Sequence, residues 1–328
     1  MINNLYNSET SFAAPYKTRM QVMLRRGARY LWQVVRYLLV CGISFIILYP
    51  LLVKLSVSFM TLEDLSDPTV KWIPKTVTLD NFRNAIEGVH FWLALKNTAL
   101  LTIITTLFQL IICSAAAYGL TKYPYPGSRI VFALIIFTVI VPPSTYISAW
   151  YMQFRHFDPF GLTTLITGND SVINSFIPFL LRALTGQGLK NGLFIYLMVQ
   201  YFRNMPHELE EAAKVDGAGA LKTFIRIALP NSRPILLTVA VLSVVWQWND
   251  DFFPSFLAPN LDFLTTNVSN IELMLFGSDA AASFAKDPPI LSAAKNAAAL
   301  LLSFPLILFF AVIQRFFTDS LERSGIVG

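Results

Sequence analysis

Residues 97–120 have the sequence NTALLTIITTLFQLIICSAAAYGL and contain no charged side chain. An α-helix rises 1.5 Å per residue, so a run of about twenty apolar residues crosses the roughly 30 Å hydrocarbon core of a bilayer. Similar apolar runs occur on both sides of this stretch in the chain. A transmembrane β-barrel would show segments of about ten residues with alternating polarity instead. The sequence therefore predicts an all-α, polytopic membrane protein.

Six transmembrane helices are expected along the chain. The apolar spans cover approximately residues 37–59, 97–120, 130–151, 172–202, 234–257 and 293–317. The fourth span is interrupted at residues 186–192, and the apolar part that follows is too short to cross alone. Broken backbone at membrane depth is tolerated where protein or a watery cavity covers it. An interfacial helix followed by a tilted span is an equal alternative for this region.

The overall composition fits a membrane protein without a catalytic or metal site. Of the 328 residues, 55% are hydrophobic and 14% are charged, whereas soluble domains have about a quarter charged residues. Cys41 and Cys113 both lie in apolar runs, which indicates buried thiols rather than a disulfide. His90, His156 and His207 have no ligand spacing, so we expect no metal site. No catalytic constellation of the Ser/His/Asp or Cys/His kind is identifiable either.

The distribution of Lys and Arg indicates how the chain is oriented. Four segments on one side hold 15 of these 25 residues: the N-terminal tail (1–36), the loop at 122–129, the loop at 203–233 and the C-terminal end. Under the positive-inside rule these segments and both termini are cytoplasmic. The expected domains are a basic tail at 1–36, a transmembrane domain at 37–318 and a tail at 319–328. The net charge of +5 then reflects orientation, and we expect no nucleic-acid partner.

The loop between the fourth and fifth spans predicts two short helices. Residues 206–230 have the sequence PHELEEAAKVDGAGALKTFIRIALP. Asn204 can cap the first helix, and Gly217 can supply the left-handed residue that ends it. Pro230 is expected to prevent continuation of the second helix.

Two helices this short need a partner, because isolated helices below about 12 residues are marginally stable. Ala212 and Ala213 offer a flat surface for close approach. Glu208, Glu210 and Glu211 offer negative charge to a basic groove. A solvated amphipathic loop is an equal alternative on these grounds.

The loop also contains a motif with fixed spacing. Glu211-Ala212-Ala213, then Gly217, then Ile227-x-Leu229-Pro230 match the EAA-x3-G-x9-I-x-L-P loop of the permeases of binding-protein-dependent ABC importers, which this chain resembles. Further stretches are similar to the carbohydrate branch of that family: residues 97–98, 115–127, 142–143, 216–218, 248–250 and 324–328. The resemblance covers residues 37–328. The chain departs from the pattern in a longer N-terminal tail, extra residues around 185–190 and an enlarged outer loop at 259–292.

The resemblance implies the ABC type I importer permease fold, in a bacterial cytoplasmic membrane, with a coupling helix that lies in a cleft of a cytoplasmic ATPase subunit. The implied coupling residues are Glu210, Glu211, Ala212, Ala213, Asp216, Gly217, Ala218, Leu229 and Pro230. The implied partners are a homologous second permease subunit, two ATPase subunits and an extracytoplasmic solute-binding protein. The chain has no Gly-Lys dipeptide, and hence no phosphate-binding P-loop. We therefore expect a transport subunit without a cofactor, whose ATPase partner binds ATP and Mg²⁺.

Candidate residues for the substrate pathway lie in the fifth span, because sugar sites combine aromatic platforms with amide or carboxylate partners. The candidates are Trp246, Trp248, Asn249 and Asp250. The alternative is that the tryptophans pack helices together and that Asn249 bonds a neighbouring helix. Tyr146 and Trp150, near the outer end of the third span, are expected in an interfacial aromatic belt.

The predicted function is therefore import of a sugar or oligosaccharide by alternating access, driven by ATP in a partner subunit. A polyol, glycerol phosphate, peptide or amino acid is an alternative cargo, because the loop motif indicates coupling to an ATPase and does not indicate which solute is transported. An ion-coupled secondary transporter is less favoured, because few ionisable residues lie inside the spans.

Overall fold

The computed structural model describes residues 13–276 and 288–324, and its regular elements are helices. Within this part of the chain, the one strand-like contact is a single antiparallel bridge between Met60 and Val77. The all-α prediction is confirmed. The middle of the predicted outer loop, residues 277–287, and the last four residues of the predicted C-terminal tail lie outside the described residues.

Three helices are long and apolar enough to cross a membrane. They are α1 (Ala13–Ser58), α4 (Phe91–Lys122) and α18 (Pro288–Ser324), of which α1 and α18 qualify over Gly27–Ser58 and Leu291–Arg315. These helices correspond to the first, second and sixth predicted spans. The described part of the basic N-terminal tail is helical and continues directly into the first span.

The third predicted span is not one continuous helix. Helix α5 (Ser128–Ile140) ends before the short 3₁₀ turn η1 (Pro143–Thr145), and α6 (Ile147–Arg155) follows in a new direction. Proline has no backbone N–H and disfavours helical geometry in the preceding residue. The Pro142-Pro143 pair therefore ends α5, and the prediction of an unbroken span at 130–151 is wrong.

The fourth span is broken where the sequence indicated. Helix α8 (Ile177–Leu184) and helix α9 (Asn191–Arg203) are separated by residues 185–190. Two residues of the break have left-handed backbone, Gly186 at φ 75° and Lys190 at φ 61°. Since neither conformation can continue an α-helix, the interruption is part of the backbone fold.

The fifth span is also interrupted, contrary to the prediction. Helix α13 (Arg233–Trp248) ends at Asn249, and α14 (Phe252–Leu257) starts after Asp251. The side chain of Asp250 accepts hydrogen bonds from the N–H groups of Phe252 and Phe253 at 3.1 and 3.3 Å. Short polar side chains that bond to nearby backbone compete with helix hydrogen bonds. The Asn249-Asp250-Asp251 run therefore ends α13.

A fourth candidate span is a bent pair, in which Ala220–Asn231 meets Arg233–Trp248 at 77°. By length and composition, the described residues contain three candidate spans, or four with this pair. The interruptions at 141–146 and 185–190 explain why the six predicted spans are not six long helices.

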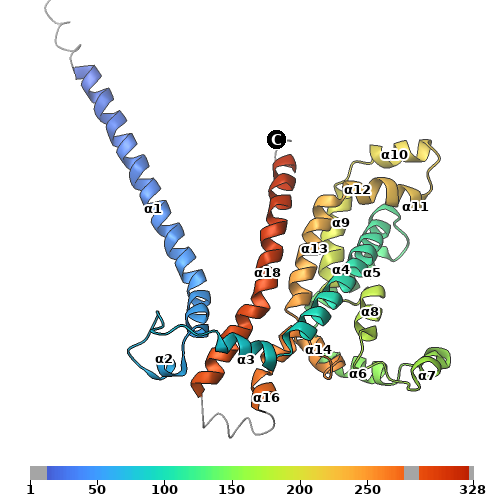
Figure 1. The fold of residues 1–328 in the computed structure, drawn as a ribbon. Helices are drawn as coiled ribbons and strands as arrows, with labels where there is room; N and C mark the ends of the chain where they lie inside the picture. The colour runs from blue at the N-terminus through green and yellow to red at the C-terminus, as the bar shows by residue number, and fades with distance from the viewer. Residues whose placement is uncertain (1–12, 277–287, 325–328) are drawn as a thin grey trace, which may run out of the picture.

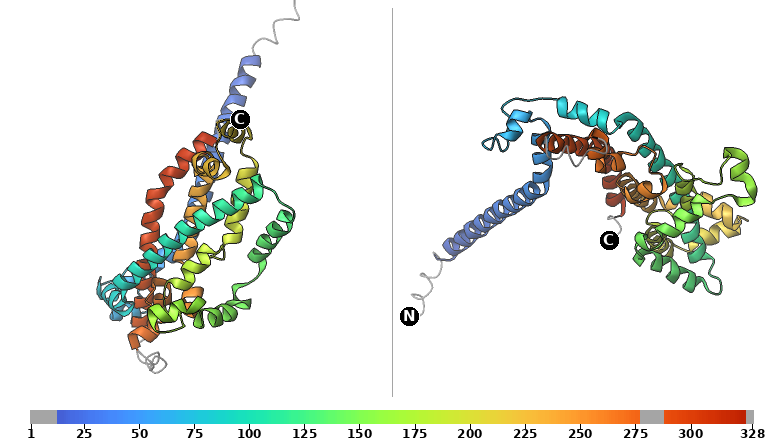
Figure 2. Two further views of the ribbon diagram at one scale, coloured as in Figure 1. Left: turned by 90° about the vertical axis from the view of Figure 1, so that its right-hand side faces the viewer. Right: turned by 90° about the horizontal axis from the view of Figure 1, so that it is seen from below.

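The centre of the bundle is α4, which packs against α8, α9 and α13. Fully buried side chains from α4, α9 and α13 include Cys113, Phe194, Met198, Phe202 and Val239. Helix α18 packs against α1 and α3 (Asp80–Gly88), but α1 leans away from the bundle (Figures 1 and 2). Residues 27–50 of α1 are exposed. Cys41 is among them, so the prediction of its burial is wrong.

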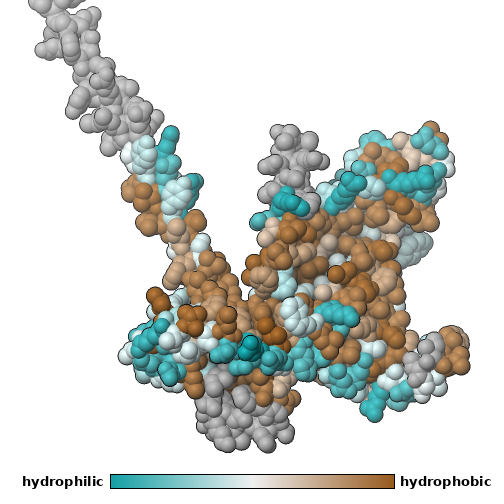
Figure 3. Space-filling view, viewed as in Figure 1, coloured by the Kyte–Doolittle hydropathy of each residue, from teal (hydrophilic) through white to brown (hydrophobic). Residues whose placement is uncertain are grey.

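Short helices cover both ends of the bundle. At one end lie α10 (Glu208–Val215), α11 (Ala220–Thr223), a π-helical turn η3 (Phe224–Ala228) and α12 (Leu229–Asn231). The start of α1 and the end of α18 lie at this same end (Figure 1). The opposite end contains α2 (Leu62–Ser66), η2 (Pro159–Gly161), α7 (Leu162–Thr167), α15 (Leu264–Ser269) and α16 (Ile271–Phe276). A broad hydrophobic band separates the two ends (Figure 3).

Candidate functional site

The first loop helix, α10, ends in a glycine-dependent cap. Gly217 has φ 73°, which confirms the predicted left-handed residue. Its N–H donates to the carbonyl of Lys214 at 3.0 Å, and the N–H of Ala218 donates to the carbonyl of Ala213 at 2.9 Å. This is the Schellman arrangement, in which the left-handed residue turns the chain back over the last helical turn. Asn204 does not cap α10, because it is the C-terminal cap of α9.

The second loop helix is longer than predicted. Residues 220–231 are helical throughout, with a π-helical turn at Phe224–Ala228, where the N–H of Leu229 donates to the carbonyl of Phe224. The wider π turn leaves room for the ring of Pro230, which would otherwise clash with the carbonyl four residues earlier. The helix includes Pro230 and ends one residue later, at Asn231. The expectation that it stops at Pro230 is wrong.

A buried ion pair connects α10 to the bundle. The Nζ of Lys122, at the end of α4, lies 3.2 Å from Oε1 of Glu210, and the two side chains are 3% and 8% exposed. Lys122 also donates to the carbonyl of Met205 at 3.3 Å. Glu210 thus points into the protein and not toward a partner groove as predicted. The two α10 residues on this inward side are Glu210 and Ala213.

The outward side of the loop is exposed and partly apolar. Val215 is 87% exposed, and Leu221 is 70% exposed. Glu208, Glu211, Ala212 and Asp216 are also exposed, and so is Pro230, while Leu229 is half-buried. The two adjacent alanines thus lie on different sides of α10: Ala213 packs inward and Ala212 faces outward. Apolar side chains beside carboxylates form a surface that is suited to another protein.

The candidate residues of the fifth span do not gather at one place. Trp248 is buried, and its Nε1 donates to the carbonyl of Leu302 in α18 at 3.1 Å. The side chain of Asn249 donates to the carbonyl of Val245 in its own helix. Trp246 packs on Phe194, with ring centroids 5.7 Å apart. The carboxylate of Asp250 accepts the N–H groups of Phe252 and Phe253 at the start of α14. The geometry of Trp248 fits the alternative in which it packs helices together.

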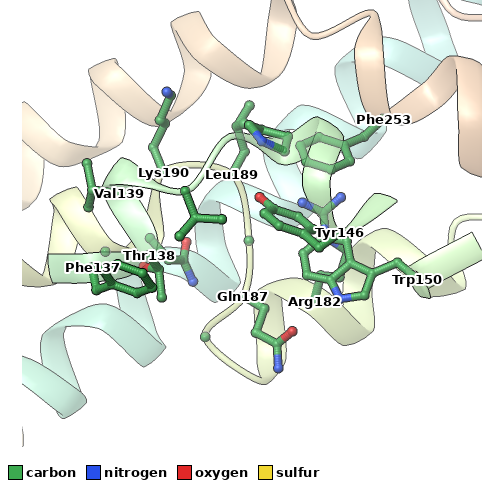
Figure 4. Close-up of a pocket in the computed structure, with 16 residues that line it drawn as sticks. Phe137, Thr138, Val139, Tyr146, Trp150, Arg182, Gln187, Leu189, Lys190 and Phe253 are labelled. Atoms are coloured by element: carbon green, nitrogen blue, oxygen red, sulfur yellow. The ribbon is translucent and has the colours of Figure 1, made fainter. Parts of the chain in front are cut away.

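A cavity of about 470 Å³ opens beside the break in the fourth span. It is lined by the end of α5, by Tyr146 and Trp150, and by residues 186–192 (Figure 4). Arg182 of α8 projects into the cluster of Tyr146, Trp150 and Phe253 on one side of the cavity. The aromatic-belt prediction does not account for these contacts of Tyr146 and Trp150.

A buried polar network holds the break in its shape. The side-chain nitrogen of Gln109, in α4, donates to the carbonyl of Leu189 at 2.8 Å and to Oδ1 of Asn191 at 2.5 Å. Ser243 of α13 donates to the oxygen of the same amide at 2.6 Å. Gly192 allows α9 to approach α5, because a Cβ there would lie 2.7 Å from the carbonyl oxygen of Ile135. Protein thus covers the broken backbone, which is the condition for such a break at membrane depth.

Residues 109–323 match the model of the family described as "Binding-protein-dependent transport system inner membrane component". The chain belongs to this family. The matched residues of this inner membrane component include the loop with Gly217, the broken fourth span and the interrupted fifth span. The chain is accordingly a membrane-embedded permease.

Several sugar permeases are similar in sequence to this chain. "Trehalose transport system permease protein SugB" of Mycobacterium tuberculosis (strain CDC 1551 / Oshkosh) is 27% identical over 79% of this chain and 85% of its own. "Maltodextrin transport system permease protein MdxG" of Bacillus subtilis (strain 168) is 28% identical over 92% and 98%. "Melibiose/raffinose/stachyose import permease protein MelC" of the same strain is 29% identical over 82% and 88%.

A solved structure has the same fold as the permease. It is described as "Crystal structure of a bacterial ABC transporter involved in the import of the acidic polysaccharide alginate". The TM-score is 0.67 at 20% identity, covering 88% of this chain and 98% of that chain. The permease therefore has the fold of an ABC type I importer permease.

Sequence reasoning missed two features of the permease. Lys122 contributed to the count of cytoplasmic cations, but nothing in the pattern linked it to Glu210, far away in the chain. Arg182 had a visible signal, because it is the one charged residue in the otherwise apolar segment 172–184. An ionisable residue inside a span indicates a functional site by default.

Proposed function

We propose that this chain is the permease subunit of an ATP-driven, solute-binding-protein-dependent importer that moves a sugar or oligosaccharide across the membrane by alternating access. The observation that supports this most strongly is the family match over residues 109–323. The names of the similar permeases, which refer to trehalose, maltodextrin and melibiose, support the cargo class. The chain itself is not an enzyme in this proposal.

The ATPase side of the proposal rests on the loop. Two cytoplasmic ATPase subunits supply ATP binding and hydrolysis, and ATP and Mg²⁺ bind to them. One ATPase covers the outward face of α10, where Glu211, Ala212, Asp216 and the exposed Val215 lie. The Lys122–Glu210 ion pair then transmits movement of α10 to α4, because the pair is nearly inaccessible to water. The Gly217 cap fixes the direction in which the chain leaves α10.

The proposed topology has six crossings in a bacterial cytoplasmic membrane. The third consists of α5 and the turn that follows it, the fourth of α8 and α9, and the fifth of α13 and α14. Both termini are cytoplasmic, so the tails at 1–36 and 319–328 and the loop at 203–233 share one side. The excess of Lys and Arg in these segments supports that orientation.

The remaining partners follow from the surfaces that the chain leaves uncovered. A homologous second permease subunit and membrane lipid cover the exposed apolar helix α1 and the hydrophobic band of the bundle. A solute-binding protein docks at the end opposite α10–α12 and delivers the cargo. Trp246, Trp248, Asn249 and Asp250 remain the candidates in the fifth span for contact with the cargo or for gating.

Reconstitution in proteoliposomes tests this proposal. We expect uptake of labelled trehalose, maltotriose, raffinose or diacetylchitobiose only when the second permease, the ATPase pair and the loaded binding protein are present with ATP. An ionophore should have no effect. Uptake by this chain alone that an ionophore abolishes would identify an ion-coupled carrier. Transport of a polyol, glycerol phosphate, peptide or amino acid in place of every saccharide would overturn the cargo class.

A further inference from the structure

Arg182 is a buried cation whose charge is attracted by Asp250, but no carboxylate is in direct contact with it in the described part of the chain. Its guanidinium carbon lies 3.7 Å from the ring centroid of Phe253 and 4.2 Å from that of Trp150. The residue is 5% exposed. Among the described residues it forms no ion pair, and its Nε has no hydrogen-bond acceptor. The nearby carboxylate of Asp250 instead accepts the N–H groups of Phe252 and Phe253.

The two rings compensate only part of the cost of burying this charge. Cation–π contacts are made by the flat faces of the guanidinium, whereas its N–H donors lie in the plane and point past the rings. A buried donor without an acceptor costs about 1–3 kcal/mol, and more for a charged group. Oxygen acceptors of a ligand in the cavity would offset part of this cost by bonding the terminal nitrogens of Arg182.

The cavity beside Arg182 has the size and chemistry of a small-molecule site. Its volume of about 470 Å³ lies in the range of roughly 300–1,000 Å³ for ligand pockets. Tyr146 and Trp150 line it and are half-buried, so part of each ring is open to the cavity. Gln187 adds an exposed amide. No carboxylate occurs among the lining residues, and the break at 185–190 is also where the sequence departs from the family pattern.

The depth of the cavity argues against a lipid headgroup as its occupant. Helices α5 and α9 both run between the cavity and the α10–α12 end, and each has 13 residues. At 1.5 Å per residue this places the cavity about 20 Å from that end, in a hydrocarbon core about 30 Å thick. A polar ligand at this depth has to come through the protein.

We infer that this cavity binds one saccharide ring of the cargo during its passage through the permease. The inference rests on the proposed sugar-importing function. The N–H groups of Arg182 donate to ring hydroxyl oxygens, the amide of Gln187 bonds a second hydroxyl, and the C–H face of the ring packs on Tyr146 and Trp150. The specificity-determining site then lies at the broken fourth span. The sequence pattern of aromatic and amide residues had predicted it in the fifth span.

Protection of a cysteine in the cavity tests the inference directly. In the complete importer, with Cys41→Ser and Cys113→Ala in this chain, Gln187→Cys is reacted with a water-soluble methanethiosulfonate. We expect that the transported member of the saccharide panel slows the reaction at least about threefold, and that a saccharide which is not transported has no effect. Equal rates with and without the transported saccharide would overturn the inference.

Transport by an Arg182 variant gives the second measurement. Arg182→Met should lower saccharide uptake about tenfold or more, as expected for the loss of one charge-assisted hydrogen bond, in complexes that assemble normally. Arg203→Met is the matched control, because its guanidinium also lies over a ring, 5.3 Å from the centroid of Phe132, but outside the cavity. If the wild-type importer transports a saccharide and Arg182→Met transports it equally well, the inference fails while the proposed function stands. If the wild-type importer transports no saccharide, both fail.

Discussion

Lys122 and Arg182 are both buried cations in one helical bundle, but the protein compensates their charges differently. Lys122 lies 3.2 Å from Glu210 and donates to a backbone carbonyl, so its charge is paired within the chain. Arg182 lies between two aromatic rings and has no acceptor for its Nε among the described residues. A paired charge connects two elements of the fold, whereas an incompletely satisfied charge beside a cavity is available to a ligand.

The largest effect is expected from removing Glu210. Glu210→Ala leaves the ammonium of Lys122 buried without its counter-ion, and breaking a buried pair in this way costs about 3–5 kcal/mol. The thermal unfolding midpoint of this chain in detergent, measured without the ATPase subunits, should fall clearly. Glu211→Ala, one residue later on the exposed side, is the control and should change stability by no more than about 0.5 kcal/mol. Equal effects of the two variants would show that the ion pair is not structural.

The double variant Lys122→Met with Glu210→Met sharpens the same point. Replacing both buried ions with apolar side chains removes the unpaired charge and can be close to neutral for stability. We expect the double variant to unfold nearer to the wild type than either single variant does. Stability losses that simply add would mean that the two side chains do not interact. The double variant lacks the ion pair. The rate of substrate-stimulated ATP hydrolysis in the complex that contains it therefore measures how much the pair contributes to coupling, separately from its contribution to stability.

A smaller effect is expected at the cap of α10. Gly217→Ala places a Cβ at φ 73°, with no steric contact within 4 Å, so the cost is the backbone strain of about 1–2 kcal/mol. Gly219→Ala is the matched control, because Gly219 has φ −71° and is equally open. We expect Gly217→Ala to weaken co-purification with the ATPase and to lower substrate-stimulated hydrolysis. If Gly219→Ala lowered both as much, the left-handed cap would not be the relevant feature.

The smallest loss of stability is expected at Arg182. Arg182→Met removes two cation–π contacts, worth about 0.5–2 kcal/mol. It also removes the charge that attracts the Asp250 carboxylate, but that carboxylate keeps its hydrogen bonds from the N–H groups of Phe252 and Phe253. The unfolding midpoint should therefore fall less than with Lys122→Met. A loss as large as that of Lys122→Met would contradict the distinction between the two cations.

The sequence predicted the features that depend on local pattern. The charge-free run at 97–120 predicted the membrane helix α4. The spacing of the motif from Glu211 to Pro230 predicted the cytoplasmic loop and indicated the permease family. Gly217 could be predicted as the left-handed residue, because glycine is the residue that ends helices in this conformation. The interruption of the fourth span was visible as glycines inside an apolar segment.

The features that depend on long-range contacts could not be predicted in the same way. The direction in which Glu210 points depends on Lys122, which is distant in the chain, and the roles of Tyr146 and Trp150 depend on their position beside Arg182. The end of α13 at Asn249 was missed because an apolar run does not reveal that Asp250 bonds two backbone N–H groups. The predicted length of the third span gave too little weight to Pro142-Pro143, although that signal was present.

We propose that an ATPase subunit covers the outward face of α10 in the assembled importer. A cryo-EM map of the complex, with its second permease and ATPase pair, tests this claim directly. We predict that Val215 and Leu221, which are 87% and 70% exposed in this chain, lie buried in a cleft of the ATPase. A map in which both side chains remain in solvent, with no ATPase within contact of α10, would contradict the account.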